Sequence, residues 1–326
     1  MMRVAVIGLG IGKVHLQEYA ANPRTRIAAV VDINPEARQA SAAAYGVPGY
    51  ASIAEMLRQT PIDAASVCTP PAYHAAQVEE LAAAGVHALV EKPMAPTLAD
   101  CHRMIEAAQR GGVTLMIGQK KRFSAPYAWL KPRLGGEFGE PKWASIKYAL
   151  GRVVKPWFWD ERDGGGPLLE NTIHIWDLTR FLMGEVATVY ARGGNLFRPD
   201  VGDQIDAASA TLGLANGGTV SVACGYGSEW GYAEERVSIA TPLVCCDVSG
   251  PFDRPALLRY IWRQEPKNVH EMTFAEATGF AEEIDEFLDA IAERRPPAVT
   301  GEDAARSIAV ALAAKRSIRE AREIRV

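Results

Sequence analysis

Two short segments of the chain carry residue types and spacings that can do chemistry. The first is Gly8-Leu9-Gly10-Ile11-Gly12, which follows an apolar run and leads into a stretch with helical spacing. The second is Glu91-Lys92-Pro93, which ends another apolar run. Ligands of open parallel sheets bind at the carboxyl ends of the strands, so Lys92 would face such a ligand. Its ammonium could hydrogen-bond a carbonyl or alcohol oxygen and stabilise alkoxide character. The alternative is a lysine that only pairs with an acid.

The glycine segment predicts a site for the pyrophosphate of a dinucleotide. Gly8, Gly10, Ile11 and Gly12 would form the turn, because the backbone must approach the phosphates and a helix N-terminus must face them. Asp32 follows Gly12 by 20 positions, at the end of the next apolar run. A carboxylate there accepts hydrogen bonds from ribose hydroxyls and repels a 2′-phosphate, which favours NAD over NADP as cofactor. Asp32 could also serve as a helix cap.

Three further segments are expected to lie beside the cofactor, at the carboxyl ends of the strands. Cys68-Thr69-Pro70-Pro71 ends an apolar run, and its prolines stop the strand. We expect Thr69 and Pro70 to line the cofactor, with His74 one turn later in either a cofactor-binding or a structural role. Glu91, beside Lys92, and Gln119, after the last apolar run of this half, complete the predicted cofactor site.

A second constellation lies between Gly164 and Asp177. Glycines and Pro167 precede a helical pattern in which Glu170 and His174 are four apart and His174 and Asp177 three apart, so that they share a face. A histidine held by a carboxylate can relay a proton near neutral pH, which makes Lys92, His174, Asp177 and Glu170 the candidate catalytic residues. A buried, packing histidine is the alternative.

Candidate substrate-binding residues surround this constellation. Trp157 and Trp159 could place aromatic faces against a ligand, although tryptophans are more often core residues. Lys120 and Arg122 follow the last strand of the first half and would lie at the domain junction, where a solvated hinge is an equal alternative. The predicted substrate-binding set is Lys120, Arg122, Trp157, Trp159 and Asn171.

The order of apolar patterns predicts two domains, 1–120 and 121–326. In the first, short apolar runs alternate with helical patterns, which indicates a doubly wound parallel sheet of the Rossmann type. The second reads as an α+β domain with a large, open, mostly antiparallel sheet and two closing helices. The fold class is therefore α/β. Expected strands of the first domain are 3–7, 27–31, 64–68, 88–90 and 114–117, with helices at 14–21, 35–45, 72–84 and 98–109. The second has helices at 125–134, 168–183, 279–294 and 302–321, and strands at 142–149, 186–191, 207–214, 219–224, 236–240, 243–248, 257–262 and 270–274.

Composition narrows the classes of protein further. The 326 residues have 48% hydrophobic and 23% charged side chains and a net charge of -4, with no basic block, which argues against a nucleic-acid partner. No apolar segment is long enough to span a bilayer and no leader is evident, so we expect no membrane partner. The five cysteines show no CxxC spacing, which predicts reduced thiols in a cytoplasmic protein and no metal site.

These motifs together resemble the glucose–fructose oxidoreductase, inositol dehydrogenase and MocA family. The residues that carry the likeness are the glycine segment with His15, the Cys68–Pro71 segment with His74, the Glu91-Lys92-Pro93 motif and the stretch from Gly164 to Asp177. The resemblance implies an NAD(P)-dependent oxidation of a hydroxyl in a sugar, sugar derivative or inositol-like polyol, or the reverse reaction. It implies that Lys92 polarises the reacting oxygen and that His174 is the proton acceptor. It also implies a homodimer or homotetramer built through the C-terminal sheet.

Two departures from the family pattern and three alternatives stay open. The glycine segment is one residue shorter than the commonest form, and Glu170 stands where many members carry Asp. The alternatives are redox-assisted cleavage of a glycosidic bond with bound NAD, NADPH-dependent reduction of a ketosugar, and a non-enzymatic nucleotide-sensing regulator. Retention of both Lys92 and His174 disfavours the last, because a sensor needs neither.

Overall fold

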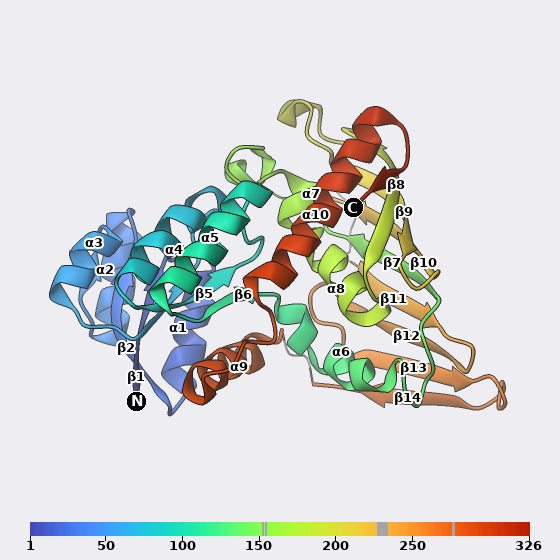
Figure 1. Cartoon of the computed structure of the whole chain (residues 1–326), viewed down its shortest axis with the longest axis horizontal. Coiled ribbons are helices and arrows are strands. Elements are labelled where there is room, and N and C mark those ends of the chain that lie inside the picture. Colours follow the sequence, from blue (N-terminus) through green and yellow to red (C-terminus); the bar gives the residue numbers. More distant parts are fainter. Residues whose placement is uncertain (152, 154, 227–233, 276–277) are drawn as a thin grey trace. The chain divides into compact units, whose positions relative to one another are not determined.

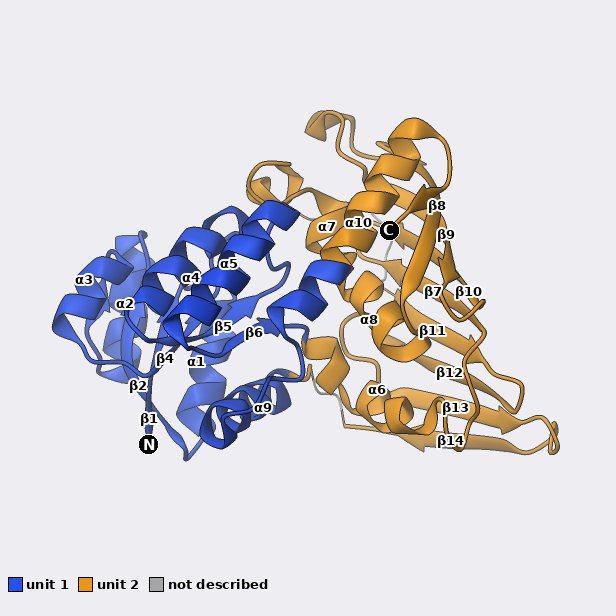
Figure 2. Ribbon diagram, viewed as in Figure 1, with its two compact units in different colours: residues 1–119, 280–306 blue, residues 120–279, 307–326 orange. Residues whose placement is uncertain are grey.

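The computed structural model describes residues 1–151, 153, 155–226, 234–275 and 278–326. The chain divides into two compact units, each discontinuous in sequence (Figure 2). Unit 1 comprises residues 1–119 and 280–306, and unit 2 comprises residues 120–279 and 307–326. The predicted division at residue 120 did not include the return of 280–306 to the first unit, which tertiary packing alone decides.

Unit 1 is built on a six-stranded sheet in the order β3-β2-β1-β4-β5-β6, in which all pairs are parallel. Its strands are buried on both faces, as their continuous apolar runs predicted. The order reverses between β1 and β4, and ligands of such sheets bind at this reversal. The strands are β1 (Met2–Ile7), β2 (Thr25–Val31), β3 (Gly49–Tyr50), β4 (Ala64–Val67), β5 (His87–Glu91) and β6 (Leu115–Gly118).

Helices cover this sheet, and their ends follow local chemistry. Helix α2 begins where the Asn34 side chain accepts hydrogen bonds from Glu36 and Ala37 N–H and Pro35 takes the first position, and it ends at Gly46 with φ 65°. Helix α1 packs against α9, and α4 packs against α5 (Figure 1). The helices are α1 (Gly12–Ala21), α2 (Pro35–Tyr45), α3 (Ile53–Gln59), α4 (His74–Ala83), α5 (Leu98–Gly111) and α9 (Phe280–Glu293), with the short 3₁₀ turn η1 (Pro71–Tyr73).

Unit 2 is built on a nine-stranded sheet in the order β14-β13-β12-β11-β7-β10-β9-β8-β15. Among the described residues of this sheet, β7 and β10 alone pair in parallel; the other neighbours are antiparallel, as expected for a chain of hairpins. In β10 buried and exposed residues alternate, so one face of the sheet is covered and the other is not. The strands are β7 (Trp143–Ala149), β8 (Val186–Gly194), β9 (Ala207–Leu214), β10 (Thr219–Gly225), β11 (Glu234–Ala240), β12 (Val244–Pro251), β13 (Leu257–Trp262), β14 (Val269–Thr273) and β15 (Ile324–Arg325).

The helices of unit 2 lie on one side of its sheet (Figure 2). The predicted helix 168–183 is in fact two, because the chain breaks at Asn171 and Thr172. No helix among the described residues is long and apolar enough to cross a bilayer. The helices are α6 (Ala125–Leu130), α7 (Pro167–Glu170), α8 (Ile173–Met183) and α10 (Gly301–Glu320, shared with unit 1), with 3₁₀ turns η2 (Lys120–Phe123), η3 (Lys131–Arg133), η4 (Pro156–Trp159) and η5 (Pro199–Val201).

Candidate functional site

The glycine loop follows β1 at the point where the strand order reverses. Gly8 has φ 87°, and a Cβ there would lie 2.8 Å from the backbone of Cys68 and Thr69, so only glycine fits. A Cβ on Gly12 would lie 2.8 Å from Cγ1 of Val6, whereas one on Gly10 would meet nothing within 4 Å. Helix α1 then begins with no side-chain cap and no acidic residue in its first turn. This loop fits an anionic pyrophosphate, which the helix N-terminus attracts.

Asp32 lies directly after β2 at the same edge of the sheet. Its two oxygens accept hydrogen bonds from the N–H of Leu9, at 2.6 Å, and of Asn34, at 2.7 Å. The helix cap of α2 is Asn34, so Asp32 instead joins the glycine loop to the end of β2. A carboxylate has about four acceptor positions, so two remain for the hydroxyls of an adenosine ribose.

The segment after β4 is held by its own side chains. Thr69 Oγ1 donates to Gln77 Oε1 at 2.6 Å. The buried ring of His74 lies between two carbonyl oxygens, with Nε2 2.8 Å from that of Thr69 and Nδ1 3.1 Å from that of Met94. Burial lowers the pKa of His74, although the carbonyls oppose the shift. These contacts favour the structural alternative for His74, which fixes Thr69 and Pro70 in place.

Lys92 and Gln119 follow β5 and β6. The Lys92 N–H donates to Oε2 of Glu91 at 3.0 Å, and Glu91 is 5% exposed. The buried carboxylate therefore holds the backbone of Lys92 in place. Gln119 is 1% exposed, and its Oε1 has no hydrogen-bond partner among the described residues. A buried amide oxygen without a partner is expected where a ligand supplies the donor. The glycine loop and the predicted cofactor residues Asp32, Thr69, Lys92 and Gln119 thus all follow the carboxyl-terminal ends of strands in one parallel sheet.

In unit 2, Glu170, Asn171 and His174 surround the break between α7 and α8. The Thr172 hydroxyl lies 2.8 Å from the Tyr226 hydroxyl, which holds the break. Glu170 and His174 are therefore not four apart within one continuous helix, as the sequence pattern implied. Both are buried, and the Asn171 Oδ1 accepts from the Tyr148 hydroxyl at 3.2 Å.

Asp177 and Arg122 bind each other. Nε and Nη2 of Arg122 donate to the two Asp177 oxygens at 2.7 and 2.6 Å, and Ser307 donates to the same carboxylate at 3.0 Å. The Asp177 side chain is 2% exposed. Removal of one partner of such a buried pair strongly destabilises the protein, because the other charge is left without a partner. These contacts favour a structural role for both residues over the predicted roles in orienting His174 and in binding substrate.

Lys120 belongs to a buried charge cluster that sequence reasoning did not detect. Lys120 contacts Asp253 at 2.5 Å, and Lys121 contacts Glu235 at 2.5 Å and Asp253 at 3.2 Å. Tyr127 donates to the same Glu235 at 2.9 Å. More than 100 positions separate the lysines from these acids, so no local pattern could have paired them. The cluster fixes η2, and it favours a structural role for Lys120.

The two predicted tryptophans differ in their surroundings. Trp159 is buried, its indole N–H donates to the Val153 carbonyl at 2.9 Å, and the Arg198 guanidinium lies 5.0 Å from its ring centre. Trp157 is partly exposed, and the Lys155 ammonium lies 5.7 Å from its ring centre. Trp157 is therefore the better placed of the two to meet a ligand. Among the described residues no group of three or more His, Cys, Asp or Glu could hold a metal ion.

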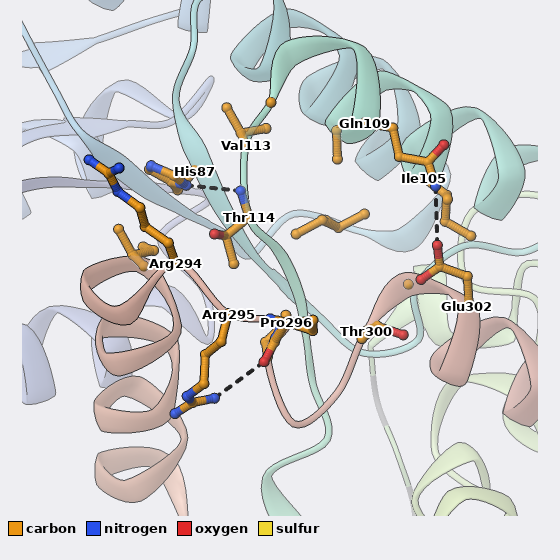
Figure 3. A pocket seen from close by; sticks show the side chains of 16 residues that line it. His87, Ile105, Gln109, Val113, Thr114, Arg294, Arg295, Pro296, Thr300 and Glu302 are labelled. Carbon is orange, nitrogen blue, oxygen red and sulfur yellow. Dashed lines mark hydrogen bonds between the residues drawn. The ribbon is translucent and has the colours of Figure 1, made fainter.

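A cavity of about 730 Å³ lies in unit 1 (Figure 3). His87, at the start of β5, and Thr114, just before β6, line it together with Arg294 from the end of α9. The cavity is at the amino ends of these strands, whereas ligands of such sheets bind at the carboxyl ends. We therefore do not assign it to the cofactor.

His87 in this cavity should make the stability of unit 1 sensitive to acid. Its Nδ1 accepts the Thr114 N–H at 2.9 Å, a bond that protonation of this nitrogen would break. Burial lowers the pKa of His87 below its ordinary value of 6.5. The unfolded chain then binds the proton first as the pH falls below about 6.5, so this contribution to stability is present above that pH and declines on acidification.

The matching variant is His87→Asn, whose side-chain oxygen keeps an acceptor for Thr114 but does not titrate. Denaturant unfolding between about pH 8 and pH 5 should give a shallower loss of stability for this variant than for the wild type. The stability of the variant should still decline somewhat with falling pH, because burial also lowers the pKa of His74. Equal slopes for the two proteins would contradict the assignment.

Comparison with known proteins agrees with this fold. Residues 2–119 match a family model described as an oxidoreductase family with an NAD-binding Rossmann fold, and residues 134–241 match a GFO/IDH/MocA C-terminal domain. The uncharacterized oxidoreductase YrbE of Bacillus subtilis is 30% identical over 96% of this chain and 93% of its own length. The myo-inositol 2-dehydrogenase of Thermotoga maritima is 28% identical over 100% of this chain and 98% of its own.

Solved structures lead to the same group. The WlbA dehydrogenase of Bordetella pertussis, in complex with NADH and UDP-GlcNAcA, matches with a TM-score of 0.85 at 27% identity and covers 100% of this chain and 98% of its own. The Rossmann sheet, the glycine loop at its reversal point and these matches define an NAD-binding oxidoreductase. The chain belongs to the glucose–fructose oxidoreductase, inositol dehydrogenase and MocA family.

Proposed function

We propose that the protein is an NAD-dependent dehydrogenase that acts on a hydroxyl or carbonyl of a sugar, sugar derivative or inositol-like polyol. The observation that carries the proposal is the position of three groups at the carboxyl-terminal ends of strands in one parallel sheet. The glycine loop follows β1, Asp32 follows β2 and Lys92 follows β5. The names of relatives support the substrate class, since they include a myo-inositol 2-dehydrogenase and a UDP-N-acetylglucosamine 3-dehydrogenase.

The proposed mechanism assigns one task to each of three side chains. When bound, NAD accepts the hydride from the substrate carbon. The Lys92 ammonium donates a hydrogen bond to the substrate oxygen and stabilises the negative charge that develops there. The His174 imidazole takes the hydroxyl proton on a ring nitrogen and returns it in the reverse reaction. Glu170, four residues before His174, is proposed to assist this histidine. Asp177 is instead proposed to stabilise the fold, because its carboxylate binds Arg122 and Ser307.

The direct test is incubation of the protein with NAD and a panel of cyclitols, free aldoses and nucleotide-linked sugars. Formation of NADH together with a ketone or lactone product, identified by NMR, is the expected result. Release of an aglycone without net NADH would replace the proposal with redox-assisted glycoside cleavage. Absence of turnover by a protein that binds NADH would favour a sensor.

Substitution of Asp32 tests the choice of cofactor. In Asp32→Ser we expect NADH to bind about 10-fold or more weakly, because hydrogen bonds to a charged group contribute about 1.5–3 kcal/mol. NADPH should bind more tightly, because the repulsion of its 2′-phosphate is gone. The measurement is fluorescence titration with both nucleotides, with Glu36→Gln, a nearby charge change in α2, as the control. An unchanged preference in Asp32→Ser would place the ribose away from this carboxylate.

Assembly and compartment are part of the same proposal. The uncovered face of the unit 2 sheet carries Trp143 and Tyr190, which are 46% and 39% exposed. Large aromatic residues on an exposed face support a homodimer or homotetramer through this sheet. The five cysteines are all free, and Cys245 alone of them is exposed, which supports a reducing cytoplasm.

A further inference from the structure

A chain of hydrogen-bonded side chains runs through unit 1 beneath the glycine loop. The Tyr19 hydroxyl lies 2.8 Å from Oγ of Ser66, and this Oγ lies 3.0 Å from Nδ1 of His15. Nε2 of His15 lies 3.1 Å from Oε1 of Glu91. Tyr19, Ser66 and His15 are at most 1% exposed. Polar groups this deeply buried need hydrogen-bond partners, and these side chains supply them to one another.

The chain has a direction that its chemistry fixes. A carboxylate oxygen accepts hydrogen bonds, so we assign a hydrogen to Nε2 of His15, which donates it to Oε1 of Glu91. The other oxygen, Oε2, accepts the Lys92 N–H at 3.0 Å. One carboxylate is therefore held by a histidine on one side and holds the backbone of the lysine on the other. Bonds to a charged acceptor are stronger than bonds between neutral groups.

These residues connect two parts of the candidate site that lie on strands with no direct pairing to each other. His15 is in the first turn of α1, the helix that begins at Gly12 of the glycine loop. Glu91 is the last residue of β5, which is separated from β1 by β4. The Phe280 ring packs edge-on against the His15 ring, with ring centres 5.5 Å apart. Side chains thus link the start of α1 directly to the Lys92 peptide, in addition to the strand pairings that run through β4.

We propose that His15 is a positioning residue for Lys92: it fixes the Glu91 carboxylate and so holds the Lys92 peptide in a set place relative to the glycine loop. The catalytic part of this inference rests on the proposed function of Lys92. The structural part, that His15 holds the Lys92 peptide in place through Glu91, does not rest on that function, because it can be measured without turnover. Neither Tyr19 nor Ser66 is proposed to contact substrate; they hold the ring of His15.

Two substitutions of His15 separate the linkage from packing. In His15→Asn the short side chain keeps an acceptor for Ser66 but does not reach Glu91, whereas in His15→Gln the amide N–H₂ can still donate to Glu91. We expect hydrogen exchange at the Lys92 amide to accelerate about 10-fold or more in His15→Asn and much less in His15→Gln. The turnover number should fall about 10- to 100-fold in His15→Asn, with the NADH dissociation constant little changed, since a small displacement of a catalytic group is costly.

Thr25→Val is the matched control, because it removes a buried hydrogen bond from Thr25 to the Tyr19 carbonyl at the other end of α1. It should leave exchange at the Lys92 amide unchanged. The proposal is overturned if the Lys92 amide stays protected in His15→Asn, or if exchange rises equally throughout β1 and β4. Should His15→Asn not fold, Ser66→Ala provides the same comparison with a smaller expected effect. If turnover is absent or independent of Lys92, the proposed function fails while the exchange result still decides the linkage.

Discussion

Lys92→Met should reduce the turnover number about 10²- to 10³-fold while NADH continues to bind. The size follows from the loss of one donor to a developing oxyanion, which costs about 2.7–4 kcal/mol in enzymes that depend on it. Methionine has a similar length but neither charge nor donor, and the hydrogen bond from Lys92 to Glu91 uses the backbone N–H, which the substitution retains. The measurement is steady-state kinetics on the best substrate of the panel, with NADH binding followed by fluorescence.

Lys267→Met, an exposed lysine between β13 and β14, serves as the control for loss of a positive charge. It should retain the wild-type turnover number. If Lys92→Met raised only the Michaelis constant for the substrate, Lys92 would bind substrate equally in the ground state and the transition state, and its role in polarising the oxygen would be wrong.

His174→Ala should lower the turnover number about 10²- to 10⁴-fold, the range that a general base contributes. The deletion leaves a space in which added imidazole can accept the proton, so imidazole should restore part of the rate. The measurement is turnover with and without imidazole, after circular dichroism has shown that the variant is folded, because His174 is buried. His102→Ala, an exposed histidine of α5, is the control.

A buried histidine that merely packs gives a different pattern. In that event His174→Ala would lose stability and its remaining folded fraction would keep the wild-type turnover number. Imidazole would then have no effect on the rate. Such a result would remove His174 from the mechanism and leave Lys92 as the only assigned catalytic group.

Local signals determined most of what the sequence predicted correctly. Helix α2 matches the predicted range 35–45, because Asn34, Pro35 and Gly46 mark its two ends by side-chain capping and backbone conformation. Helix α3 was missed although a signal was present: Ser52 accepts the Glu55 N–H, which is half of a capping box. The glycine loop was predictable because the close approach of β1 to β4 leaves no space for a side chain at Gly8.

The remaining features depend on partners distant in the sequence. The break between α7 and α8 is held by Tyr226, 54 positions from Thr172. Arg122 binds both oxygens of Asp177 from 55 positions away, a partner that helical spacing alone does not indicate. The return of α9 to unit 1 likewise depends on packing, since nothing in its apolar pattern indicates that it packs against α1.

The most direct test of the central claim is hydride transfer from a deuterated substrate. A polyol or sugar that the panel identifies, carrying deuterium on the carbon of the reacting hydroxyl, is incubated with NAD and the wild-type protein. We expect NADH with deuterium at the nicotinamide C4, one equivalent for each carbonyl formed, and almost none with Lys92→Met. Carbonyl formation without deuterium in NADH, or equal transfer by Lys92→Met, would contradict the claim.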